Sequence, residues 1–224
     1  MSLVKWIADK RHAWLAARDL TRYHHELSVW DAEHDALEKE LQLAIAPGGF
    51  GHVMEGLGLV LHKSEDVFLV LTGAALVEPK QLPGHWVGSY NGVSLRLMKG
   101  VTYHTGGSRG TYVPGPQSPA PVAVGTATIT NQRVVFQSNQ QAREFLYSKL
   151  LGYQHDPSSP LTYFQVSNRQ KVSGVGYDLQ SARTWRFRLS LALAHFNGES
   201  PNFAQHMRDE VSQHDLNKPR LIAP

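Results

Sequence analysis

The longest stretch of this sequence without glycine or proline runs from Ser2 to Ala46, and Pro47-Gly48-Gly49 follows it directly. The stretch is rich in alanine, leucine, glutamate, lysine and arginine, which favour the α-helix. Proline and glycine break helices, so the sequence predicts a helical arm over residues 1–46 and a hinge over residues 47–51. The remainder then divides into a folded domain, residues 52–216, and a short tail, residues 217–224.

One apolar seam runs along the predicted arm in alternating steps of three and four, the a/d pattern of a coiled coil. Its members are Ala13, Ala16, Leu20, Tyr23, Leu27, Trp30, His34, Leu37, Leu41 and Ala44. The candidates for self-association or partner-helix binding are Leu20, Tyr23, Leu27, Trp30, Leu37 and Leu41. The alternative is that the seam docks on the apolar surface of the domain that follows.

The two halves of the arm differ in charge. Residues 2–22 carry five basic and two acidic side chains, whereas residues 23–44 carry one basic and six acidic ones. Opposite charges of this kind favour antiparallel pairing. The pairing could occur between two chains, or within one chain if the arm folds into a hairpin near Tyr23-His24-His25.

After the hinge, short apolar runs alternate with turn residues, which is typical of an antiparallel β-barrel or sandwich. The expected strands are His52–His62, Asp66–Leu71, Trp86–Ser89, Val93–Lys99, Gly125–Thr130, Arg133–Gln137, Glu144–Tyr147, Leu161–Val166, Val172–Tyr177 and Arg183–Leu189. Tyr90-Asn91-Gly92 predicts a hairpin between two of them, and Asn131-Gln132 predicts another. A C-terminal helix is expected after Ser200, which is a natural N-cap, with Pro201 at its first position.

The segment from Gly125 to Phe136, GTATITNQRVVF, resembles the central hairpin of GRAM and bacterial pleckstrin-homology-like domains. The following Phe145–Tyr153 is similar to the next strand of that family and the turn after it. The resemblance implies a mainly β, α+β fold: an antiparallel seven-stranded barrel closed by a C-terminal helix. Within the motif, Thr130 and Asn131 suit a tight turn, and Arg133 can reach a carboxylate or a carbonyl.

Members of that family bind phosphoinositides, peptides or partner domains, or serve as scaffolds. The lipid-binding members carry a basic cluster in the loop between their first two strands. Here the corresponding loop holds only Lys63, beside Glu65 and Asp66. The resemblance therefore gives little support to headgroup binding at that loop.

Basic residues dominate the predicted barrel: eleven lysines and arginines against three acidic residues lie between Arg96 and Arg188. In Arg183–Leu189, a strand would bury Trp185 and Phe187 on one face and solvate the arginines between them on the other. The candidates for a basic binding patch are Arg186, Arg188, Lys149, Arg169, Lys171 and Arg109. Arg109 falls in a stretch, His104–Val124, that is expected to be irregular because it is rich in glycine and proline.

The residues give no support to catalysis. Cysteine is absent, which excludes thiolate chemistry and cysteine-ligated metals. A Gly-x-Ser-x-Gly elbow is also absent, the carboxylates form no recognisable pair, and the twelve histidines show no ligand spacing. The chain is expected to be a non-enzyme without metal or cofactor.

The sequence thus predicts a binding or scaffolding module that associates with a protein partner or a second copy through its helix. Its barrel would dock a protein, a peptide or an anionic surface. The alternative is peripheral binding to anionic lipid through a basic barrel face, and nucleic-acid binding or an unrecognised enzyme ranks below it. No signal peptide is expected, and no stretch approaches the ~20 apolar residues of a membrane-spanning helix. A cytoplasmic protein, at most peripheral at a membrane, is the expectation.

Overall fold

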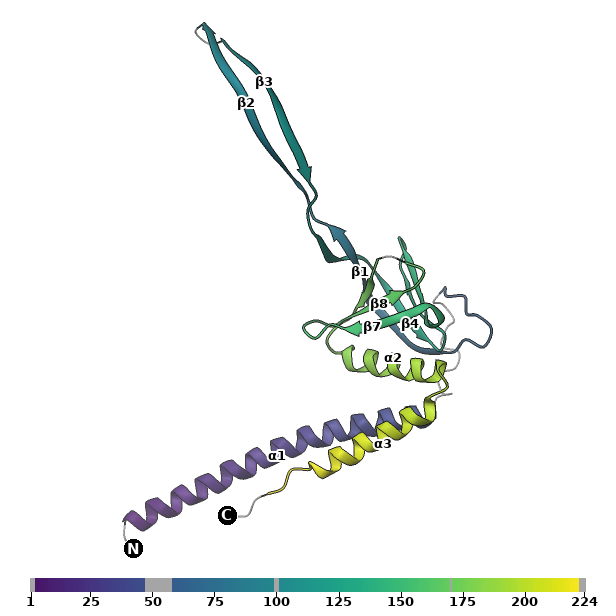
Figure 1. Ribbon diagram of the computed structural model, residues 1–224. Coiled ribbons are helices and arrows are strands. Elements are labelled where there is room, and N and C mark those ends of the chain that lie inside the picture. The colour runs from purple at the N-terminus through teal and green to yellow at the C-terminus, as the bar shows by residue number, and fades with distance from the viewer. Residues whose placement is uncertain (1–2, 47–57, 99–100, 170, 222–224) are drawn as a thin grey trace. The chain divides into compact units, whose positions relative to one another are not determined.

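The computed structural model describes residues 3–46, 58–98, 101–169 and 171–221 (Figure 1). A long helix, α1 (Leu3–Ile45), comes first, and two helices, α2 (Ala182–Phe196) and α3 (Ser200–Leu216), end the chain. The strands are β1 (Val67–Gln81), β2 (His85–Met98), β3 (Val101–Val113), β4 (Gln117–Thr130), β5 (Arg133–Gln137), β6 (Ala142–Leu146), β7 (Leu150–His155), β8 (Leu161–Val166) and β9 (Ser173–Gly176). A 3₁₀ turn, Tyr147–Lys149, joins β6 to β7.

Seven strands form one antiparallel sheet that curls into a half-barrel, in the order β6-β5-β4-β1-β9-β8-β7. The class is α+β and mainly β, as the sequence predicts. The hairpin β4–β5 turns at Asn131-Gln132, and β8 covers Leu161–Val166, both as expected. Aromatic side chains of this sheet contribute to the hydrophobic core. Phe145 and Phe164 are fully buried and stack with ring centroids 4.6 Å apart.

The strands β2 and β3, which follow β1 and precede β4 in the sequence, pair only with each other and form a two-stranded ribbon. The prediction of a hairpin turn at Tyr90-Asn91-Gly92 is wrong, because β2 runs straight through these residues. Asn91 and Gly92 lie opposite Gly107 and Gly106 of β3. The local turn preference of Asn-Gly is outweighed here by a ladder that continues on both sides of it.

The expectation of an irregular stretch over His104–Val124 is wrong for the same reason. The stretch contains most of β3 and the first half of β4, and only residues 114–116 between them lack strand structure. Of the predicted strand His52–His62, residues 52–57 lie outside the described residues, and residues 58–62 are not a strand. The described residues directly before Lys63 are therefore not a strand.

The alternation in Arg183–Leu189 also misleads, because this segment is helical and belongs to α2. Four residues of α2 are fully buried, and three of them, Trp185, Leu189 and Ala192, are four and three positions apart, which is helical spacing. Two turns of an amphipathic helix can mimic strand alternation over a window this short. The helix α3 includes Ser200, and Glu199 occupies the N-cap position that the sequence analysis gave to Ser200.

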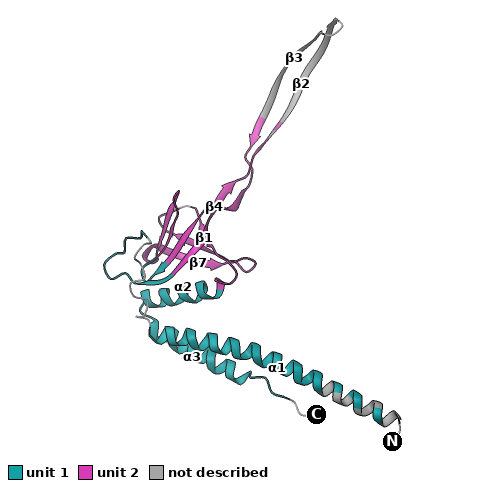
Figure 2. Ribbon diagram, turned by 180° about the vertical axis from the view of Figure 1, so that it is seen from behind, with its two compact units in different colours: residues 1–69, 129–133, 183–224 teal, residues 70–128, 134–182 magenta. Residues whose placement is uncertain are grey.

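The chain divides into two compact units, coloured teal and magenta in Figure 2. One unit comprises residues 1–69, 129–133 and 183–224, and the other comprises residues 70–128 and 134–182. Within the first unit, α3 lies antiparallel along the second half of α1 (Figures 1 and 2). The helix α1 is continuous from Leu3 to Ile45, so the arm does not fold into a hairpin near Tyr23. The predicted hinge, residues 47–51, lies outside the described residues.

Candidate functional site

A buried ion pair lies at the turn between β4 and β5. The Arg133 guanidinium donates from Nε to Oε1 of Glu65 at 2.7 Å and from Nη2 to Oε2 at 2.8 Å. Nη2 also donates to the Val60 carbonyl at 2.8 Å, and the Thr130 hydroxyl donates to Oε1 of Glu65 at 2.7 Å. This is the strong bidentate geometry of an arginine–carboxylate pair. Arg133 thus reaches both a carboxylate and a carbonyl, as its place in the motif predicted.

The same turn holds the neighbouring segment through amide side chains. Asn131 accepts a hydrogen bond from the Asp66 amide at 2.9 Å and donates to the Ser64 carbonyl at 3.0 Å. Gln132 donates to the Lys63 carbonyl at 3.1 Å. Ser64 has a φ of 59°, the left-handed region that side chains other than glycine seldom adopt. The hairpin therefore fixes this strained segment in place.

The Glu65 carboxylate is unsuited to acid–base work. Burial on its own raises the pKa of Glu65, but hydrogen bonds from Arg133, the His62 amide and Thr130 outweigh burial and hold the pKa below its usual range. A carboxylate that accepts this many hydrogen bonds stays ionised and has little capacity left for a substrate. The Glu65–Arg133 pair is a structural clamp.

The six candidates for a basic patch are distributed over both units. Arg186 and Arg188 lie on α2, where positions two apart are separated by about 200° around the axis. Arg186 is exposed, whereas Arg188 is half-buried, and burial lowers the pKa of its guanidinium. The prediction that these two arginines share one face of a strand is therefore wrong.

The remaining candidates belong to the other unit. Lys149 and Lys171 are exposed, and Arg169 is half-buried. Arg169 donates to the Glu144 carbonyl at 3.3 Å and lies 5.6 Å from the centroid of the Phe145 ring. Arg109 lies in β3, and its side chain is outside the described residues.

The apolar seam of α1 is occupied within the chain over its second half. Trp30 and Ala44 are buried, and the seam residues between them are half-buried. The Trp30 indole donates from Nε1 to the carbonyl of His214 in α3 at 3.0 Å. It also stacks on two imidazoles, His34 and His214, each with ring centroids 4.7 Å away. The helix α3 therefore takes the place that a partner helix was predicted to fill.

The side chains that the structure describes in the first part of α1 have no such cover. We call residues 3–22 the leading segment. Every side chain described in it is exposed except that of Asp19, which is half-buried. Trp6 and Trp14 are 49% and 62% exposed, although tryptophan is among the largest apolar side chains. Leu20, the first of the six seam candidates, is also exposed, at 44%.

Cations accompany both exposed tryptophans. Lys10 Nζ lies 5.8 Å from the centroid of the Trp6 ring, and Arg18 Cζ lies 5.4 Å from that of Trp14. Trp6, Lys10, Trp14 and Arg18 follow one another at a spacing of four, so they wind along one side of the helix. We call these four residues the tryptophan–cation ladder. The ladder was not predicted, although its spacing of four is visible in the sequence, because the apolar seam begins only at Ala13.

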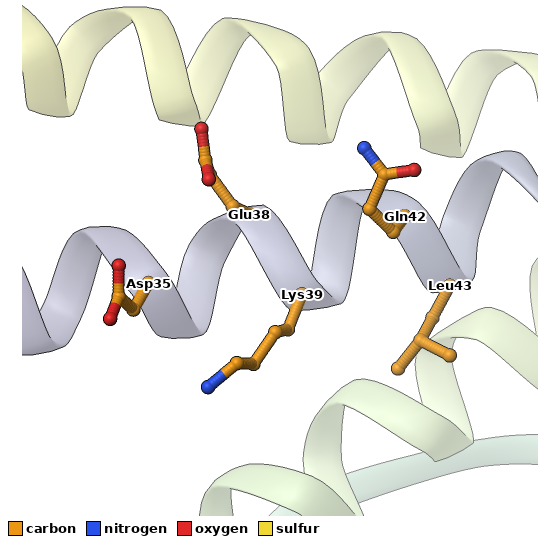
Figure 3. Close-up of a pocket in the computed structure, with 5 residues that line it drawn as sticks. All are labelled: Asp35, Glu38, Lys39, Gln42 and Leu43. Carbon is orange, nitrogen blue, oxygen red and sulfur yellow. The ribbon is translucent and has the colours of Figure 1, made fainter.

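A shallow hollow of about 630 Å³ lies beside the second half of α1, lined by Asp35, Glu38, Lys39, Gln42 and Leu43. Figure 3 shows that these side chains spread around the helix and do not converge on a point. Glu38 also lies 3.4 Å from Nε2 of His34, so it already faces a polar neighbour. The hollow lacks the paired, converging groups that catalysis needs.

Within the described ranges, no three histidines or carboxylates gather closely enough to hold a metal ion. None of the helices in those ranges is both long and apolar enough to cross a membrane. Comparison with known proteins adds no assignment: no family model, no curated protein and no solved structure matches the chain. The leading segment of α1 is the candidate functional site that the geometry leaves.

Proposed function

We propose that this chain is a non-catalytic binding module that attaches to its partner through the leading segment of α1. One observation carries the proposal: α1 has 43 residues, α3 has 17, and the part of α1 beyond α3 displays two tryptophans to solvent. Exposed apolar surface that is rimmed by polar side chains marks interaction sites, and here Lys10 lies between the two tryptophans on the same side of the helix.

The length of the helix supports the same proposal. Isolated helices shorter than about 12–15 residues are marginal in water, and most helical stability in proteins comes from packing. The described side chains of the leading segment are almost all exposed, whereas the second half of α1 is held by α3. Continuity with that second half stabilises the leading segment as a helix, ready to bind.

The charges argue against a second copy of this chain as the partner. The leading segment carries five basic and two acidic residues, so two copies of it would repel each other. Pairing with the acidic half of another α1 is also weakened. Arg183 of the same chain already binds two of those carboxylates, Glu33 at 2.7 Å and Glu40 at 2.8 Å, and α3 covers the seam.

The half-barrel serves in this proposal as the scaffold to which the helices are joined. Its GRAM-like character is part of the proposal, and two features support it: the turn of the Gly125–Phe136 segment and the antiparallel order of the seven strands. The alternative, lipid binding through a basic barrel face, loses support because its two arginines on α2 point to opposite sides of the helix.

Site-specific photocrosslinking of the full chain, in the cells that make it, tests the proposal. p-Benzoylphenylalanine at position 14 places a crosslinker in the leading segment. At position 29 it replaces Val29, which is 57% exposed on the same helix but outside that segment. We expect adducts at position 14 that disappear with Trp6→Gln, and none at position 29. Equal yields at both positions, or no adduct at either, would contradict the proposal.

A further inference from the structure

The geometry points to an anionic lipid bilayer as the surface that the leading segment of α1 binds. This inference rests on the proposed function and names the partner. The tryptophan–cation ladder combines the two residue types that suit the boundary between lipid headgroups and acyl chains. Tryptophan favours this boundary because its ring is apolar and its indole N–H is polar. Lysine and arginine can place their stems along apolar surface while their charges remain with the phosphates.

The arrangement of the ladder fits a flat surface better than a pocket. Its four residues span about three turns of the helix, from Trp6 to Arg18, which is about 18 Å along the helix axis. All four are exposed, so the ladder presents a strip rather than a point. A helix that lies in the membrane plane also contacts lipid along one side over several turns.

The charge of α1 sets the length over which it can lie on such a surface. The leading segment has a net charge of +3, from five basic and two acidic residues, and the acidic part of the helix begins at Glu26. Anionic lipids attract the first part and repel the second. Contact is therefore confined to the first part, and the half of α1 that α3 covers stays in water.

Two other occupants explain the ladder less well. A second copy brings like charge to the leading segment. Single-stranded nucleic acid also uses aromatic and basic side chains together, but it needs the ring faces for stacking. Here Lys10 and Arg18 lie over the two rings, so those faces are partly covered. Both occupants remain as outcomes of the test.

Vesicle co-sedimentation of the full chain tests the inference. The probe is phosphatidylcholine vesicles with and without about a third phosphatidylserine. We expect binding to the anionic vesicles only, and weaker binding at high salt because the charges are then screened. The variant Lys10→Gln/Arg18→Gln should lower the partition coefficient about 30-fold, since each cation near an anionic surface strengthens binding about fivefold. The variant Trp6→Gln/Trp14→Gln should lower it by about tenfold or more through lost apolar burial.

The matched control is Val29→Gln/Lys39→Gln, which removes one exposed apolar and one basic side chain from α1 outside the leading segment. It should bind like the unaltered chain, and loss of binding in it would overturn the inference. Circular dichroism of each variant verifies that the fold is retained. These substitutions lie on exposed helix positions, so no change is expected.

Sedimentation velocity and anisotropy with a labelled oligothymidine separate the remaining outcomes. A chain that ignores anionic vesicles but dimerises, or binds the oligonucleotide, through Trp6 and Trp14 overturns the lipid inference and leaves the proposed function standing. The inference is also overturned if Trp6→Gln/Trp14→Gln changes neither vesicle binding, nor oligonucleotide binding, nor self-association. Absence of position-14 adducts in the crosslinking experiment would then remove the proposed function as well.

Discussion

The turn between β4 and β5 and the leading segment of α1 handle their cations in opposite ways. At the turn, Arg133 is buried and is held by a carboxylate and a carbonyl from the segment before β1. In the leading segment, Lys10 and Arg18 are exposed and lie over tryptophan rings that are exposed themselves. The first arrangement is complete within the chain, whereas the second leaves apolar and charged groups available to a partner.

The difference shows which side chains the fold needs. A buried, fully hydrogen-bonded pair contributes to the fold, since loss of either member leaves a charge without a partner. Exposed side chains on an uncovered helix contribute little to stability. The comparison therefore assigns stability to the clamp and attachment to the ladder, and each assignment can be tested by substitution.

The largest effect is expected at the clamp. Glu65→Ala leaves the Arg133 guanidinium buried without its carboxylate, which should lower the free energy of unfolding by about 3–5 kcal/mol. The matched control is Glu78→Ala in the other unit, where the Glu78–Arg143 pair is partly exposed and should contribute about 1 kcal/mol or less. Urea unfolding measures both. Equal losses of unfolding free energy in the two variants would mean that the buried pair stabilises the fold no more than the partly exposed pair.

The next effect compares tryptophans of one helix. Trp30 is buried between two imidazoles and donates a hydrogen bond to α3, so Trp30→Ala should cost about 3 kcal/mol. Trp14→Ala should change the free energy of unfolding by no more than about 0.5 kcal/mol, because its ring has no described packing partner apart from Arg18. Urea unfolding again provides the values. A large loss for Trp14→Ala would show that the leading segment is part of the fold.

A smaller effect is expected from pH. The pKa of Glu65 is lower in the folded chain than in the unfolded chain, so its contribution is present above the unfolded pKa. That contribution disappears as the pH falls through the folded pKa. The free energy of unfolding should therefore fall on acidification from pH 5, and less steeply in Glu65→Gln. Parallel pH profiles for the two proteins would contradict this assignment.

Local patterns predicted the elements that depend on local physics. The absence of glycine and proline marked α1, and the Thr-Asn-Gln-Arg turn marked the hairpin β4–β5. Pairing between distant segments was out of reach: Asn91-Gly92 looks like a turn until Gly106 and Gly107 are known to lie opposite. The seven residues around Trp185 fit both the period of a strand and the period of a helix. The full length of α2 is needed to distinguish the two.

The candidate site was predicted only in part. The seam correctly marked the face of α1 that is buried, yet no sequence pattern showed that α3 of the same chain covers it. Which part of α1 stays uncovered depends on where α3 ends, near Trp30, and this is set by the three-dimensional path of the chain. The tryptophan–cation ladder could have been found by its spacing, but its exposure could not.

Hydrogen exchange along α1 of the full chain, with and without anionic vesicles, tests the central claim most directly. Without vesicles, amides of the leading segment should exchange faster than those of residues 30–44, because α3 covers only the latter. With vesicles containing about a third phosphatidylserine, exchange should slow by about tenfold or more in residues 3–22 and remain unchanged in residues 30–44. Slower exchange confined to the strands, or no change in the leading segment, would contradict the account.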